Sequence, residues 1–191
     1  MGEATGLLPR PEALPAVDTR KISKIPPLVA PLKGDCMDFK SLDDILDFAI
    51  AKEVEAEQFY LSLCEEETLS GNRQTFQDFA KEEHKHANLL ESLKAGGVME
   101  GVEEYQFKWI KDIKRSNLVL DIEYQKGMNY RDILMLAIKR EEKALALYNE
   151  LLDRADTANS RKVFKILCQE EAKHKLTLES MYDDYMAEMG D

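Results

Sequence analysis

The chain has 191 residues, of which 44% are hydrophobic and 33% are charged, and its formal net charge is −11. A length of this order favours one domain with an appendage. The acidic balance argues against nucleic-acid binding, which needs a basic surface to neutralise phosphates. No apolar run approaches the roughly 20 residues that cross a bilayer, and the N-terminus lacks the apolar core of a secretory signal. We therefore expect a cytoplasmic protein with neither nucleic-acid nor membrane partners.

All six prolines lie in the first 31 residues, and none occurs in the rest of the chain. Because proline lacks an amide donor and breaks helix interiors, residues 1–37 are predicted to form an extended, Pro-rich N-terminal arm. Residues 38–191 are predicted to form one helical domain. Composition leaves two interpretations of the arm open: a flexible tail, or a strap that packs its apolar residues on the bundle or on a partner subunit.

Four long helices are predicted from apolar residues that recur near a 3.6-residue period. The first begins at about Ser41, which resembles a helix N-cap. The breaks between the helices fall at 70–72, 97–129 and 156–160. The longest break is predicted to contain a short helix at about 103–114 and an extended piece at 118–124. One long crossover between two tight hairpins predicts an all-α, ferritin-like four-helix bundle.

The second pair of helices repeats the first at a fixed offset of 88 residues. The repeated residues form a Glu…Glu-x-x-His pattern, namely Glu53, Glu83 and His86, then Glu141, Glu171 and His174. A period this long is not that of a solenoid. Two duplicated αα-hairpins that face each other, each contributing three of these residues, are predicted instead.

The six repeated residues are typical of a two-metal site. Residues three apart share a helix face, so the glutamate and histidine of each Glu-x-x-His pair can bind one ion. Glu53 and Glu141 lie among apolar positions of their own helices, where an uncompensated carboxylate is costly. Two divalent ions would balance the four carboxylates. Oxygen-rich ligation with one imidazole per ion suits Fe or Mn, and the absence of thiolate ligands makes structural zinc a poor fit.

Residues adjoining the predicted ligands have several interpretations. Tyr60 and Tyr148 each follow a ligand glutamate by seven residues. They either pack in the core or donate a hydroxyl hydrogen bond to a ligand carboxylate, and the sequence favours neither. His84 has no counterpart in the second half and is predicted to lie at the surface. Glu82 and Glu170 are predicted to face solvent or a neighbouring helix.

Several segments resemble the rubrerythrin branch of the ferritin-like superfamily. They are Ala49-Ile50-x-x-Glu53-x-x-Ala56-x-x-Phe59-Tyr60, Glu82-Glu83-x-x-His86, Ala137–Glu141, Glu170-Glu171-x-x-His174-Lys175 and Tyr182–Tyr185. The resemblance covers about residues 38–187. It implies a non-haem di-iron centre that turns over peroxide or dioxygen, in a homodimer or a larger homo-oligomer. It also implies that the six repeated residues are the metal ligands, with Glu83 and Glu171 as bridges.

The sequence departs from this family in two places. Full-length rubrerythrins carry a rubredoxin domain with two C-x-x-C pairs, and Cys36, Cys64 and Cys168 form no such pair. Electrons are therefore expected from a separate, rubredoxin-like donor. Typical rubrerythrins also place a further glutamate where this chain has Ala144, and that carboxylate helps one iron change ligands on oxidation. Without this carboxylate the chain departs from the family's characteristic peroxidase cycle, while the basic metal site stays intact.

Three classes of function follow from these patterns. The leading hypothesis is a di-iron oxidoreductase that reduces hydrogen peroxide or dioxygen in protection against oxidative stress. The second is an iron-handling protein that oxidises Fe(II) for storage or transfer, for which the negative charge is suitable. The third is a structural or binding bundle in which the metal only links the helices.

Overall fold

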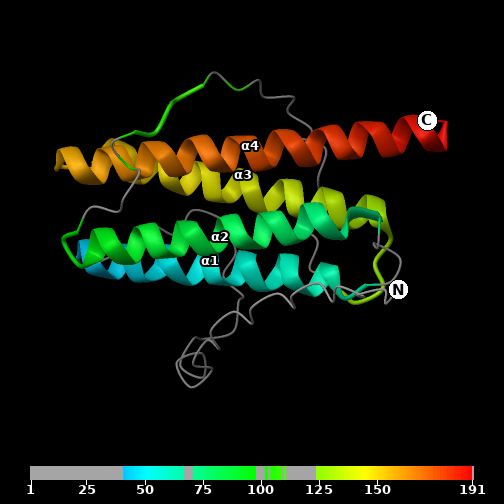
Figure 1. Ribbon diagram of the computed structural model, residues 1–191, viewed down its shortest axis with the longest axis horizontal. Coiled ribbons are helices and arrows are strands. Elements are labelled where there is room, and N and C mark those ends of the chain that lie inside the picture. The colour runs from blue at the N-terminus through cyan, green and yellow to red at the C-terminus, as the bar shows by residue number, and fades with distance from the viewer. Residues whose placement is uncertain are drawn as a thin grey trace, which may run out of the picture. The chain divides into compact units, whose positions relative to one another are not determined.

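The computed structural model describes residues 41–66, 71–97, 102, 104–108, 110 and 124–190. In these ranges it contains four helices and no strand: α1 (Leu42–Cys64), α2 (Arg73–Lys94), α3 (Tyr130–Arg154) and α4 (Ala158–Met189) (Figure 1). The chain divides into the units Met1–Asp38 and Phe39–Asp191, and every described residue belongs to the second. The predicted arm at 1–37 lies outside the described residues. The predicted ferritin-like four-helix bundle is confirmed.

Polar side chains cap the N-termini of α1, α3 and α4. The Ser41 hydroxyl accepts a hydrogen bond from the Asp44 amide at 3.1 Å, so the predicted N-cap of α1 is confirmed. α4 begins earlier than its predicted break at 156–160. Thr157 and Ser160 form a capping box, in which each side chain accepts from the backbone amide of the other. This box satisfies two amides that would otherwise lack partners, so Ala158 is already helical.

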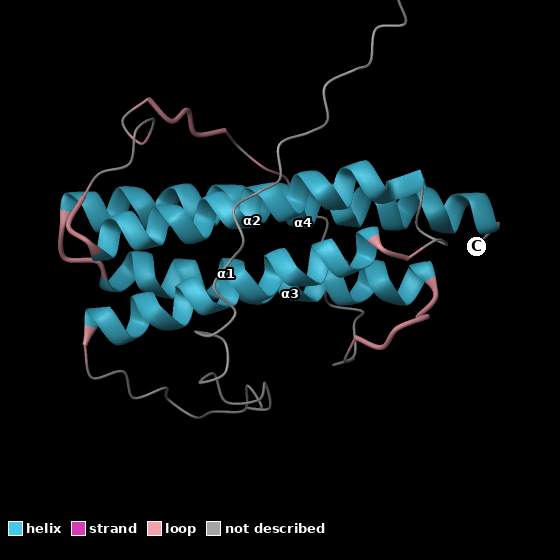
Figure 2. Ribbon diagram, turned by 60° about the horizontal axis from the view of Figure 1, so that its bottom comes forward, coloured by secondary structure: helices cyan, strands magenta, loops and turns pink. Residues whose placement is uncertain are grey.

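The helices form two hairpins, α1 with α2 and α3 with α4, and α2 also contacts α4. Figure 1 shows that α2 ends and α3 begins at opposite ends of the bundle. The connection between them must therefore run the length of the bundle, as the predicted crossover does. Figure 2 shows the same four helices from a second direction. α1 and α4 run in one direction, and α2 and α3 run in the other.

The apolar core is divided into two clusters, and each draws on all four helices. One cluster is formed around Tyr60, Phe76, Leu134 and Leu178. The other is formed around Leu46, Leu90, Leu151 and Phe164. On every helix the predicted ligands lie between the residues of these two clusters. The sequence thus places polar residues at the centre of the bundle and seals them with apolar residues at both ends.

The predicted short helix at 103–114 is wrong where the structure describes that segment. Residues 105–108 and 110 are not helical. The Lys108 amide donates to Gln169 Oε1 at 2.8 Å, and Gln169 Nε2 donates to the Lys108 carbonyl at 2.7 Å. These backbone groups are satisfied by a side chain of α4 and so take no part in a helical turn. The extended piece predicted at 118–124 lies outside the described residues except for Tyr124.

We expect the substitution Thr157→Ala to lower the free energy of unfolding by about 1 kcal/mol, because it removes the N-cap of α4. Urea unfolding followed by circular dichroism measures this change. Thr177→Ala is the matched control, since Thr177 is an exposed threonine in the interior of the same helix. There alanine is the better helix former, and stability should be unchanged or slightly higher. Equal losses in both variants would contradict the assigned cap.

Candidate metal centre

The six repeated residues meet in the middle of the bundle. Glu53 comes from α1 and Glu141 from α3, while the two Glu-x-x-His pairs come from α2 and α4. All six side chains are buried, with residue exposures between 1% and 5%. Their ligand atoms form two groups, one of Glu53, Glu83, His86 and Glu171, the other of Glu83, Glu141, Glu171 and His174. The structure therefore brings together every predicted ligand.

Glu83 and Glu171 belong to both groups, which is the position of a bridging carboxylate. His86 Nδ1 lies 3.0 Å from Glu83 Oε2 and 3.1 Å from Glu171 Oε1. On the other side, His174 Nδ1 lies 3.0 Å from Glu83 Oε1. Each histidine also faces the unshared glutamate of its own group, with Nδ1 at 3.5 Å from Glu53 for His86 and 3.5 Å from Glu141 for His174. The geometry repeats about an approximate two-fold axis, as duplicated hairpins require.

These separations suit metal ions. Two donors bound at right angles to one ion, each at about 2.1 Å, lie about 3 Å apart. Three of the four buried polar atoms that lack a hydrogen-bond partner among the described residues belong to this cluster: Glu83 Oε1, Glu171 Oε1 and His174 Nδ1. An unsatisfied buried polar atom costs about 1–3 kcal/mol. Two cations would give these atoms partners, so the residues present fit a two-metal group.

Two buried tyrosines connect the hairpins through the carboxylates. The Tyr60 hydroxyl on α1 donates to Glu141 Oε1 on α3, and the Tyr148 hydroxyl on α3 donates to Glu53 Oε1 on α1. Both tyrosines have no exposed surface. Each therefore packs in the core and also bonds a carboxylate, so the two interpretations hold together. These bonds leave the second oxygen of each glutamate available to the cluster.

Burial and neighbouring charges shift the pKa values of the cluster carboxylates. Burial, with a further contribution from Glu83, raises the pKa of Glu53 to about 7. Burial and the neighbouring Glu83 and Glu53 raise the pKa of Glu171 well above its usual value. Burial also opposes ionisation of Glu83, but the two facing histidines outweigh it and hold the pKa of Glu83 well below its usual value.

The two imidazoles respond to the carboxylates in turn. Burial alone would lower the pKa of His86, but its contacts with Glu171, Glu53 and Glu83 raise it well above the usual value. The pKa of His174 is raised in the same way, by Glu83 first. Metal binding would have to displace the protons that these groups carry, since a ligating imidazole is neutral and a ligating carboxylate is ionised.

Sequence reasoning missed one contact of this centre. Glu82, half-exposed on α2, accepts a hydrogen bond from His174 Nε2 at 2.6 Å. The only available signal was that a glutamate precedes both Glu-x-x-His pairs, and this signal did not distinguish the two. His84 is exposed as predicted, and its Nδ1 lies 3.3 Å from Glu57. Ala144 packs with partly buried apolar residues against the cluster around Phe164.

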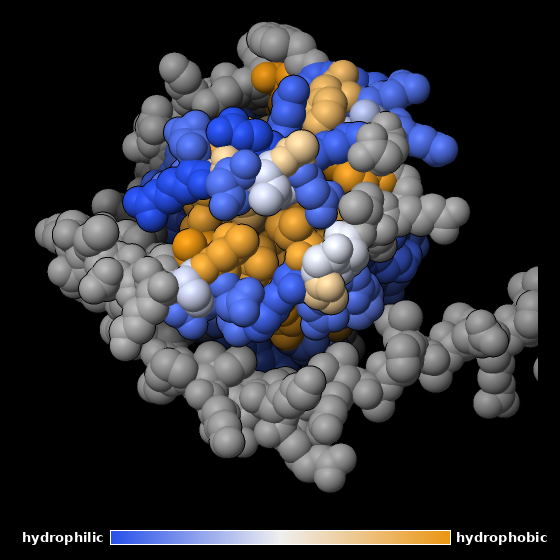
Figure 3. Space-filling model, turned by 90° about the vertical axis from the view of Figure 1, so that its left-hand side faces the viewer, coloured by the Kyte–Doolittle hydropathy of each residue, from blue (hydrophilic) through white to orange (hydrophobic). Residues whose placement is uncertain are grey.

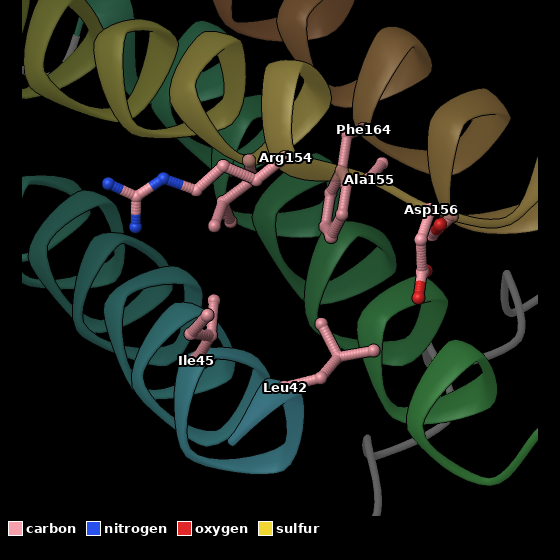
Figure 4. Close-up of a pocket in the computed structure, with 8 residues that line it drawn as sticks. Leu42, Ile45, Arg154, Ala155, Asp156 and Phe164 are labelled. Atoms are coloured by element: carbon pink, nitrogen blue, oxygen red, sulfur yellow. The ribbon is translucent and has the colours of Figure 1, made fainter. Parts of the chain in front are cut away.

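A shallow pocket at one end of the bundle is separate from this centre. It is lined by residues such as Leu42, Ile45, Arg154 and Phe164, where α1 begins and α3 gives way to α4 (Figure 4). Figure 3 shows apolar surface at this end with polar residues around it. None of the six cluster residues lines the pocket. In the described ranges, none of the four helices combines the length and hydropathy of a bilayer span.

Comparisons with known proteins agree with this architecture. A family model described as Rubrerythrin matches residues 44–127 and 132–189. Among solved structures, a hypothetical protein from Pyrococcus furiosus is 24% identical, with a TM-score of 0.57 and a match that covers 78% of this chain and 92% of that one. This likeness supports the fold alone. A comparison with curated proteins finds no match.

We expect Mn²⁺ affinity to rise with pH across the neutral range, by about tenfold per pH unit for each proton displaced. The pKa of Glu53 is raised to about 7, so near pH 6 this carboxyl is mostly protonated and each binding event must remove its proton. Calorimetric titration in two buffers of different ionisation enthalpy counts the protons released. Glu53→Gln is the matched variant and should release fewer protons. An affinity independent of pH would contradict the assigned proton sharing.

Proposed function

The chain belongs to the rubrerythrin family, and from this premise we propose that it is a non-haem di-iron oxidoreductase. Its substrate would be hydrogen peroxide or dioxygen, its electrons would come from a separate rubredoxin-like donor, and its role would be protection against oxidative stress. The proposal rests on one observation above all: six buried ligand residues form two groups that share Glu83 and Glu171. A bridged pair of cations fits this arrangement, and a single ion would leave half of it unused.

The donor set favours iron or manganese. Each group offers three carboxylates and one imidazole, and no cysteine belongs to either group. Carboxylate and imidazole ligands suit Fe and Mn, whereas structural zinc sites are mostly built with thiolates. Two ferrous ions, when bound, would each give up one electron and so supply the two electrons that reduce one molecule of peroxide. Duplication accounts for the pair, because each hairpin provides one complete Glu…Glu-x-x-His set.

The protein's own residues hold and shield the centre. Tyr60 and Tyr148 fix the orientation of Glu141 and Glu53 through their hydroxyl groups. The two apolar clusters exclude water from both ends of the site. In such a dry environment, charges on the ligands interact more strongly than they would in water. These residues therefore position the carboxylates before any substrate arrives, which is the protein's contribution to a metal-assisted reaction.

The residue at position 144 limits the proposal. A further ligand carboxylate would have to project from this position of α3, and alanine carries none. Exchange of one iron between ligands on oxidation is therefore not part of the proposed chemistry. We assign to the centre the reduction of peroxide or dioxygen without that exchange.

Metal content tests the centre directly. We expect about two Fe or Mn per chain after anaerobic purification with both metals supplied, because the two ligand groups complete two positions. The Glu53→Ala/Glu141→Ala double variant should lose this metal. Glu55→Ala/Glu150→Ala is the matched control, since it removes one glutamate outside the cluster from each of the same two helices. Elemental analysis provides the measurement. A folded wild-type protein without metal would refute the proposal.

Turnover separates the three classes of function. We expect the iron-loaded protein to consume hydrogen peroxide repeatedly when rubredoxin and an NADH-dependent rubredoxin reductase are supplied, because two bound irons can accept and return two electrons. The Glu53→Ala/Glu141→Ala variant should be inactive in the same assay, followed as NADH absorbance. Retention of many irons per chain with little peroxide turnover would favour iron handling. Melting on metal removal, with no turnover of the loaded protein, would favour a structural role.

A further inference from the structure

Two equivalent glutamates of the duplicated hairpins have different partners. Glu82 and Glu170 each precede the glutamate of a Glu-x-x-His pair, 88 residues apart. Glu82 accepts a hydrogen bond from His174 Nε2 across the α2–α4 interface at 2.6 Å. A carboxylate accepts but does not donate, so Nε2 carries the hydrogen of a neutral His174. The lone pair then lies on Nδ1, the nitrogen that faces Glu83 and Glu141.

Glu170 does not accept a corresponding hydrogen bond from His86, because its carboxylate is bound to the crossover. Its Oε1 accepts from Lys173 Nζ at 2.6 Å and from the Tyr105 hydroxyl. Lys173 Nζ also donates to the Tyr105 oxygen at 3.1 Å, which closes the group. The paired hydrogen bonds between Lys108 and Gln169 hold the same segment against α4. Glu170 is therefore bound on the crossover side of α4 and does not reach His86.

Among the described residues, His86 has no carboxylate partner that corresponds to Glu82 on His174. Its polar contacts with described residues all run through Nδ1, to Glu53, Glu83 and Glu171. Within the described ranges no carboxylate bonds its Nε2. Both imidazoles are buried, and their ring centroids lie 5.5 Å apart. His174 also lies against the ring of Phe79, with the ring centroids 4.7 Å apart. The hydrogen bond that Glu82 accepts from His174 is thus a difference between two positions that duplication made equivalent.

We propose that Glu82 is a positioning residue for His174, and that the two metal positions consequently differ in affinity. The position of His174 and Glu141 binds its ion more tightly than the position of His86 and Glu53. A carboxylate on the outer nitrogen of a ligating histidine fixes the tautomer and the ring orientation and raises the basicity of the inner nitrogen. Removal of such a partner typically weakens metal binding about 10–100-fold. This inference rests on the proposed two-metal centre.

Substitution of Glu82 is suited to the test. Its side chain is 43% exposed, so Glu82→Gln creates no cavity in the core. Glutamine removes the negative charge and keeps the shape, while Glu82→Asp keeps the charge on a shorter arm. Glu170→Gln is the matched control, because the same change is made at the equivalent position of the other hairpin. Thermal unfolding of the metal-free variants shows whether either change merely weakens the fold.

The experiment is a calorimetric titration of the metal-free protein with Mn²⁺. We expect two binding steps in the wild type. Glu82→Gln should weaken the tighter step by about 10–100-fold and leave the weaker step within about threefold, so that the two steps converge. Glu82→Asp should restore part of the loss. Glu170→Gln should leave both steps unchanged. His174→Ala should abolish the tighter step and His86→Ala the weaker one, which assigns each step to its position.

The outcomes separate a failure of this inference from a failure of the proposed two-metal centre. Wild-type protein that binds no Mn²⁺, or only one ion, would refute the two-metal centre itself. Two ions bound with equal affinity would overturn the inference alone. So would a Glu82→Gln variant with unchanged affinities, or one whose two steps weaken equally. Equal effects of Glu82→Gln and Glu170→Gln would show a general charge effect and would also overturn it.

Discussion

Four carboxylates buried at one level of a helical bundle are the constraint on which the rest of the structure depends. Charges of one sign cannot be held together in an apolar interior unless protons or cations compensate them. Contacts with these carboxylates outweigh burial and raise the pKa of both imidazoles well above the usual value. The division of the core into two clusters follows from the same constraint, because apolar packing must stop on either side of the polar level. A cation bound at this level would therefore also contribute to the stability of the fold.

The approximate two-fold symmetry of the centre comes from duplication, and the chain's connectivity breaks it. Symmetry explains why each of the two tyrosines donates a hydrogen bond to the glutamate of the opposite hairpin, Tyr60 to Glu141 and Tyr148 to Glu53. A single crossover cannot be symmetric, because it joins the end of one hairpin to the start of the other. It lies against α4 at Gln169 and Glu170, and the structure describes no corresponding segment on α2 at Glu82. Among the described residues, one side of the centre is thus covered by helices alone, while part of the crossover lies against the other.

Most of the fold and the meeting of the six predicted ligands at the centre of the bundle could be predicted from the sequence, because both depend on regular spacing. Helical periodicity locates the four helices, and a constant offset identifies Glu53 and Glu141, which would be unremarkable alone. The remaining features depend on contacts between distant segments. Nothing near residues 103–114 shows that Gln169 will bind the backbone of Lys108 and prevent a helix there. The different partners of Glu82 and Glu170 likewise depend on which helix face the crossover covers.

The crossover is much longer than its path requires. α2 has 22 residues and is about 33 Å long, a distance that about ten extended residues would span. Between Lys94 and Tyr130 the chain provides 35 residues. Because of this surplus, the length of the connection does not fix the spacing of the two hairpins. The entropic cost of closing a loop also rises only slowly as the loop lengthens. Insertions and deletions among homologous sequences should therefore gather here and spare the short stretch that carries Tyr105 and Lys108.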